Sequence, residues 1–118
     1  GWAAARLDDL AARVPARLSG LLIALASGRR AAGALRVMWR DGRLHRSPNA
    51  GWPEAATAAA LGLALSGPRS YGGRAGEEPW VHAEGRPEAR PEDIEAAVAL
   101  VWRAWGLLLA LALAAAAF

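Results

Sequence analysis

The feature that most constrains the fold is an apolar run at residues 96–118, where Arg103 is the only charged residue. A helix needs about 20 apolar residues to cross a bilayer, so this run is long enough to span one. Pro91, Glu92 and Asp93 precede it, and proline and acidic residues both favour a helix start. We therefore predict a last helix over residues 92–118 that spans a membrane. The alternative is a compact helical bundle that buries this helix.

The rest of the chain is predicted to be helical up to residue 66 and to form a loop over residues 67–91. Helical spacing covers residues 2–13, 16–27, 30–40 and 53–65. Pro15 should kink or restart the first helix, and Ser66-Gly67-Pro68 should stop the fourth. The loop is rich in glycine, proline and charge, and loops of that length are usually functional or disordered. The expected fold is all-α: one unit, a fragment of a helical integral-membrane protein.

Composition removes several classes of function. The chain has no cysteine, which excludes disulfides and thiolate metal sites, and no lysine, which excludes Schiff-base chemistry. Six arginines stand between residues 29 and 46 and only Asp41 opposes them, which favours a cytoplasmic loop beside membrane helices. A phosphate-binding patch is the second interpretation. Nucleic acid is third, because only Trp39 interleaves with these arginines.

The segment before the fourth helix reads HRSPNAGWPEAA, residues 45–56. Pro48 and Pro53 fix the backbone, Asn49 can cap a helix, and Glu54 stands where the helix dipole favours an anion. A well-made helix start explains all of this. The same cluster, which also includes His45 and Ser47, suits a polar site held by a rigid turn.

Two further clusters are candidate sites. Asp8 and Asp9 point about 100° apart on a helix. Asp9 could then pair with arginines on its own helix, leaving Asp8 free for Mg²⁺, but a solvated charged face is the simpler reading. Arg69, Tyr71 and Arg74 in the long loop could clamp a phosphate or carboxylate, or form an exposed basic loop. The sequence contains no phosphate-loop, HExxH, GxSxG or dinucleotide motif.

Five separated motifs carry a resemblance to a known family. They are RLDDL (6–10), PARL (15–18), SPNAGWPEAA (47–56), GPRSYGG (67–73) and EPW (78–80). In this order and spacing, residues 1–95 resemble the C-terminal part of the CobD/CbiB family, the adenosylcobinamide-phosphate synthases of cobalamin biosynthesis. Members of that family are much longer, multi-pass proteins of the bacterial inner membrane.

The resemblance implies an amide-forming ligase that joins aminopropanol, or its phosphate, to a side-chain carboxylate of the corrinoid cobyric acid. ATP and Mg²⁺ are its implied cofactors, the corrinoid and the amine its implied partners, with no nucleic acid. Such a ligase needs metal-binding carboxylates, arginines for phosphates and a base for the amine. We predict His45, Asn49 and Glu54 as catalytic residues, and Asp8 and Asp9 as metal ligands. Substrate and phosphate binding is assigned to Arg17, Ser47, Arg69, Tyr71 and Arg74.

The chain also departs from the family pattern. Ala12-Arg13 stands where an asparagine and an apolar residue are usual, and Ser66 where a glycine is common. The N-terminal half of the family has no counterpart here. The second hypothesis is therefore a non-catalytic membrane or interaction remnant of the same family. A fragment of this length is expected to be inactive without the missing half.

Overall fold

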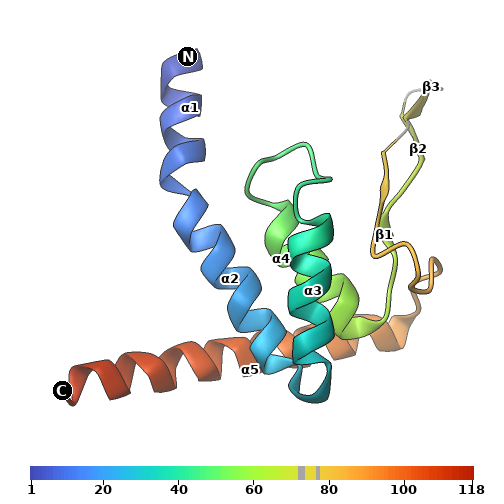
Figure 1. Cartoon of the computed structure of the whole chain (residues 1–118). Helices are drawn as coiled ribbons and strands as arrows, with labels where there is room; N and C mark the ends of the chain where they lie inside the picture. The colour runs from blue at the N-terminus through green and yellow to red at the C-terminus, as the bar shows by residue number, and fades with distance from the viewer. Residues whose placement is uncertain (72–73, 77) are drawn as a thin grey trace.

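The computed structural model describes the backbone of residues 1–71, 74–76 and 78–118, and the side chains outside residues 69–77. The helices in this part of the chain are α1 (Trp2–Ala11), α2 (Arg13–Ala26), the short 3-10 helix η1 (Gly28–Arg30), α3 (Ala31–Asp41), α4 (Gly51–Leu61) and α5 (Pro91–Ala116). Figure 1 shows α1 and α2 as one long arm, α3 and α4 as an antiparallel pair beside it, and α5 crossing beneath them. The predicted all-α fold is confirmed, apart from two small strand pairs.

The α1–α2 arm breaks where proline predicts it. α1 ends at Ala11, and α2 begins at Arg13 with Pro15 in its first turn. The N–H groups of a first turn make no bond within the helix, so the N–H that proline lacks is not needed there. Arg6 lies 5.4 Å above the Trp2 ring, and no described residue forms an ion pair with Asp9. The predicted pairing of Asp9 with arginines of its own helix is therefore wrong.

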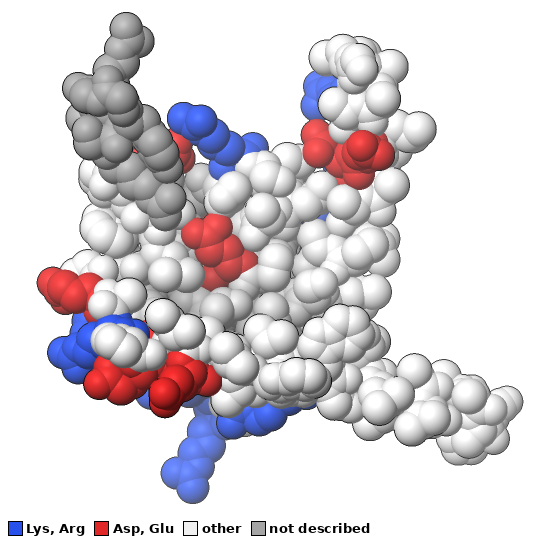
Figure 2. All heavy atoms as spheres, turned by 180° about the vertical axis from the view of Figure 1, so that it is seen from behind, with Lys and Arg blue, Asp and Glu red and all other residues white. Residues whose placement is uncertain are grey.

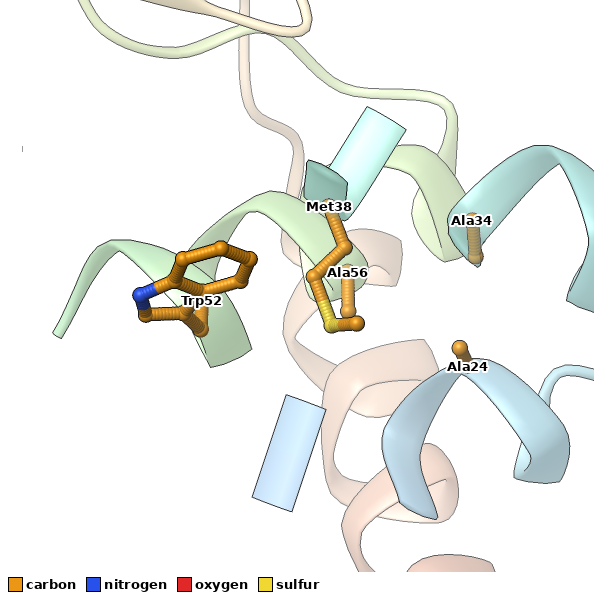
Figure 3. Close-up of a cluster of buried hydrophobic side chains, with 5 residues drawn as sticks. All are labelled: Ala24, Ala34, Met38, Trp52 and Ala56. Carbon is orange, nitrogen blue, oxygen red and sulfur yellow. The ribbon is translucent and has the colours of Figure 1, made fainter. Parts of the chain in front are cut away.

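Small residues let α2, α3 and α4 approach closely around one tryptophan. Trp52 is buried together with Met38 and the methyl groups of Ala24, Ala34 and Ala56, as Figure 3 shows. A Cβ on Gly20 of α2 would lie 2.5 Å from Met38 Sδ and 3.1 Å from the Trp52 carbonyl oxygen. A side chain at position 20 would therefore displace Met38 and push α4 away by a few tenths of an ångström. The Trp52 side chain is therefore the centre of the helical core.

The segment after α4 departs from the prediction. The helix ends at Gly62, which has a left-handed φ of 70°, four residues before the expected stop. Strand β1 (Leu65–Ser66) then pairs with β4 (Trp80–Val81), and β2 (Arg69–Tyr71) pairs with β3 (Arg74–Gly76). The prediction of a loop without regular structure was wrong here. Strands of two or three residues are too short for an alternating pattern to reveal them.

Helix α5 leaves most of its apolar surface uncovered. Its most apolar window has a mean hydropathy of 2.0 and is only 6% buried. It contacts α2 and α4, and Figure 1 shows its C-terminal part extending away from the other helices. In Figure 2 that projecting arm carries no charged atoms. Among the described residues α5 is the one helix long and apolar enough to cross a membrane.

Candidate functional site

The turn between α3 and α4 is built on two glycines that touch. A Cβ on Gly51 would stand 2.1 Å from the Gly42 carbonyl oxygen and 2.9 Å from the Cβ of His45. Because contacts that short do not occur between real atoms, both backbones can approach only with glycine at position 51. The turn of residues 42–50 is therefore closed tightly, and its polar side chains are held in fixed positions at the start of α4.

The N-cap of α4 is Ala50, which has no side-chain cap, and Ser47 rather than Asn49 satisfies the N–H groups of the turn before it. The Ser47 hydroxyl oxygen accepts hydrogen bonds from the backbone N–H groups of Asn49 and Ala50, both at 3.2 Å. A helix start leaves several N–H groups without helical partners, and a serine oxygen is a preferred acceptor for them. The prediction that Asn49 supplies the cap was wrong. With Ser47 occupied in this way, a phosphate at the same N–H groups would have to displace it.

Asn49 instead connects the turn to α1. Its Nδ2 donates to the Asp9 carbonyl oxygen at 2.9 Å, across forty residues of sequence. The Asn49 side chain is buried, and its Oδ1 has no hydrogen-bond partner in the described part of the chain. Two of the motifs that are distant in sequence, RLDDL and SPNAGW, therefore meet at this amide.

His45, Glu54 and Ser66 form a connected polar cluster on another side of the helix start. Glu54 Oε1 accepts a hydrogen bond from the Ser66 hydroxyl at 2.8 Å, and its Oε2 lies 3.4 Å from His45 Nε2. His45 Nδ1 accepts the Ser47 backbone N–H at 2.9 Å. A nitrogen that accepts has no proton, so the neutral His45 ring carries its proton on Nε2, facing Glu54. The carboxylate is thus held between two donors, with both side chains only partly exposed.

Arg17 lies against the opposite side of the turn. Its guanidinium carbon is 4.5 Å from the centre of the Trp52 ring, and Trp39 meets the same ring edge-on at 5.2 Å. The Trp52 indole N–H donates to the Pro48 carbonyl oxygen at 3.1 Å, which ties the ring to the turn. These residues border an apolar groove of about 260 Å³ between α2 and α3. Arg17 is therefore a fixed positive charge at the edge of this groove.

The predicted metal ligands do not assemble a complete site. Asp8 is exposed and Asp9 half-buried on α1. No group of three or more histidine, aspartate and glutamate side chains with metal-binding geometry occurs among the described residues. Mg²⁺ is commonly held by one or two carboxylates and the phosphates of a substrate, so Asp8 and Asp9 fit that ion only in such a shared arrangement.

The predicted anion clamp lies at the edge of the described structure. Arg69 and Tyr71 lie in β2 and Arg74 in β3, but their side chains are outside the described part of the chain. Nearby, Glu78 forms an ion pair of 2.8 Å with Arg46 of the turn. This ion pair links the segment that follows the β2–β3 pair to the turn that carries His45.

Sequence reasoning missed an ionic cluster that attaches β4 to α3. The buried Asp41 carboxylate accepts hydrogen bonds from Arg40 and from the His82 backbone N–H, all at 2.8 Å. Arg40 also binds Glu84 at 2.6 Å. The Arg40 guanidinium lowers the pKa of Asp41 below its ordinary value, although burial opposes this, and it also lowers the pKa of Glu84. The one signal in the sequence was Asp41 itself, the lone acid among six arginines.

Comparisons with known proteins give one consistent result. The family described as "CobD/Cbib protein" matches residues 1–101. Proteins named "Cobalamin biosynthesis protein CobD" are similar to this chain at 56% identity in Brucella suis and 55% in Rhodobacter capsulatus, in each case over 98% of the chain. The Rhizobium meliloti protein of the same name is 53% identical over 92% of the chain. The chain spans 35–37% of the length of these relatives. No solved structure matches it.

Proposed function

The chain belongs to the CobD/CbiB family of cobalamin biosynthesis proteins, and from this membership we propose that it forms part of an amide-forming ligase. The proposed reaction joins the amine of aminopropanol, or of its phosphate, to a side-chain carboxylate of cobyric acid. The carboxylate must first be activated, most simply as an acyl phosphate made from ATP. The amine nitrogen then attacks the acyl carbon, the carbon–oxygen bond to phosphate breaks, and a proton leaves the nitrogen.

The observation that supports this chemistry is the His45–Glu54–Ser66 cluster. Glu54 is a carboxylate whose orientation is fixed by a hydroxyl at 2.8 Å, with an imidazole 3.4 Å away. We assign Glu54 as the acceptor of the proton that the attacking amine loses. The Ser66 hydroxyl holds it in place, and His45 Nε2 faces its other oxygen. Arg17 would bind an anionic group of a substrate, and Asp8 and Asp9 would hold Mg²⁺ together with substrate phosphates.

This chain alone offers too little enclosure for the proposed substrates. The groove beside Arg17 measures about 260 Å³, below the roughly 300–1,000 Å³ typical of small-molecule sites. Two larger hollows, of about 610 and 460 Å³, are lined by α5 alone and hold none of the proposed site residues. A corrinoid and a nucleotide are larger still. We therefore propose that the remaining two-thirds of a full-length family protein completes the site. In a strain that lacks the synthase, the 118-residue chain should not restore cobalamin-dependent growth.

The direct test places Glu54→Gln in a full-length family protein that carries this chain. The amide keeps the shape of the side chain and loses its ability to accept a full proton. Since a positioned general base contributes about 10²–10⁴-fold, amide formation should fall at least a hundredfold. Glu88→Gln is the matched control, because Glu88 is exposed in the segment before α5. Normal turnover in Glu54→Gln would refute the assignment and favour a non-catalytic role for the turn.

We further propose that the protein is located in a membrane, with α5 as one of its spanning helices. The support is the uncovered apolar surface of this helix, whose most apolar window is only 6% buried. The Arg-rich turn between α3 and α4 would then lie on the cytoplasmic side, as the positive-inside rule expects.

A further inference from the structure

Ser66 has an unusual backbone conformation for a residue with a side chain. Its φ is 62°, and Gly67, which follows it, has a φ of 83°. In this left-handed region the Cβ of an L-residue crowds the backbone, and residues other than glycine, asparagine and aspartate seldom occupy it. Strained residues of this kind persist only where the surrounding structure imposes them, and they concentrate at functional sites.

The surroundings of Ser66 impose this conformation. Ser66 is paired with Trp80 across the β1–β4 ladder, and the Gly67 N–H donates to the Pro79 carbonyl oxygen at 3.3 Å. The Trp80 ring covers Gly67 so closely that a Cβ there would lie 2.6 Å from the ring. The backbone therefore cannot relax at position 66 without breaking the short strand pair.

The strained conformation places the Ser66 hydroxyl within hydrogen-bonding distance of Glu54. The Ser66 hydroxyl donates to Glu54 Oε1 at 2.8 Å, which leaves Oε2 facing His45 Nε2. Without that donor the carboxylate could rotate about its last side-chain bond, because such terminal torsions are broad. Ser66 therefore fixes the plane of the Glu54 carboxylate relative to the imidazole.

We propose that Ser66, which stands where glycine is common in the family, is a positioning residue particular to this chain and holds its Glu54 carboxylate in the reactive orientation. This inference rests on the proposed function of Glu54 as a proton acceptor. Ser66 acts through Glu54 rather than on the substrate. Loss of the hydroxyl should therefore weaken that orientation.

The test compares Ser66→Gly with Ser66→Ala in a full-length family protein that carries this chain. Both variants lose the hydroxyl, but only glycine also relieves the strain at positive φ. We expect kcat to fall about tenfold in both, the loss that a hydrogen bond to a charged group of about 1.4 kcal/mol would produce. KM should stay unchanged in both, because Ser66 acts through Glu54 and not on the substrate. The melting temperature of Ser66→Gly should equal or exceed that of the unchanged protein and lie above that of Ser66→Ala.

The possible outcomes separate this inference from the function on which it rests. A purely structural serine predicts unchanged kcat in Ser66→Gly, because glycine accepts the same backbone conformation. That result, with Glu54→Gln inactive, would overturn the positioning role and leave the proposed function intact. If Glu54→Gln keeps normal turnover, the proposed function fails first. A tenfold loss in both serine variants, with Ser66→Gly at least as stable as the unchanged protein, would support the inference.

Discussion

Replacing Gly51 by alanine tests whether the closure of the turn depends on two glycines in contact. The new Cβ would stand 2.1 Å from the Gly42 carbonyl oxygen and 2.9 Å from the Cβ of His45. Heavy atoms pack comfortably at about 3.5–4.0 Å, so the 2.1 Å contact requires the backbones to separate by more than about 1 Å. Neither neighbour is the flexible end of a side chain that could move aside.

The expected loss of unfolding free energy is the difference between the cost of overpacking and the gain in helix propensity. Overpacking of this kind costs about 1–3 kcal/mol, occasionally more. Alanine has a better helix propensity than glycine by up to about 1 kcal/mol, and less than that at the very start of α4. The net destabilisation is therefore about 2 kcal/mol. In a full-length family protein this lowers the melting temperature by about 4–8 °C.

Gly33→Ala is the matched control, because it makes the same chemical change in the neighbouring helix α3. Nothing lies within 4 Å of a Cβ at that position, so only the propensity gain remains and the melting temperature should hold or rise slightly. Both variants can be compared by thermal unfolding in detergent. The reasoning fails if Gly51→Ala is as stable as the unchanged protein, or if both alanines destabilise it equally.

Three further predictions follow from the contacts of the turn, the ionic cluster and α5. Since Asn49 Nδ2 donates to the Asp9 carbonyl oxygen, Asn49→Asp should place two acceptors together and cost about 1–3 kcal/mol in unfolding measurements, whereas a capping role would leave stability unchanged. The lowered pKa of Asp41, caused first by Arg40, stabilises the fold at pH values above the unfolded pKa of about 3.9. That stability is lost as the pH falls through the lower folded value, and Asp41→Asn should remove this part of the pH dependence. The chain should remain with membranes through a carbonate wash, and a detergent-free soluble monomer would contradict the membrane assignment of α5.

The helices were readable from the sequence because their signals are local. Proline and acidic residues mark the start of α5, and the prediction of its start at residue 92 differs from the structure by one residue. The end of α4 was misplaced because both Gly62 and the Ser66–Pro68 run are stop signals, and the nearer glycine takes the left-handed conformation. The strand pairs were missed because two-residue strands have no periodicity.

The candidate site was readable only in part, for a different reason. Sequence reasoning identified His45 and Glu54 from their place beside a rigid turn, but which residue satisfies the N–H groups of the turn depends on distances that no spacing rule provides. Ser47, Asn49 and their neighbours all precede the same helix. The shorter Ser47 side chain reaches the N–H groups of its own turn, which leaves the longer Asn49 side chain to reach α1.

The position of Ser66 beside Glu54 depends on contacts formed far from either residue. β1 can lie along α4 only because β4 pairs with it, and β4 is fixed where the His82 N–H meets the buried Asp41 carboxylate. His82 itself has a φ of 56°, and its ring contacts the Leu63 carbonyl oxygen at 2.8 Å. The end of β4 is therefore bound both to α3, through Asp41, and to the segment that precedes β1. Weakening Asp41 should therefore loosen Ser66 and, through it, the orientation of Glu54. If the site functions as proposed, Asp41→Asn should lower turnover without contacting any substrate, and by less than Ser66→Gly, because the hydroxyl is still present.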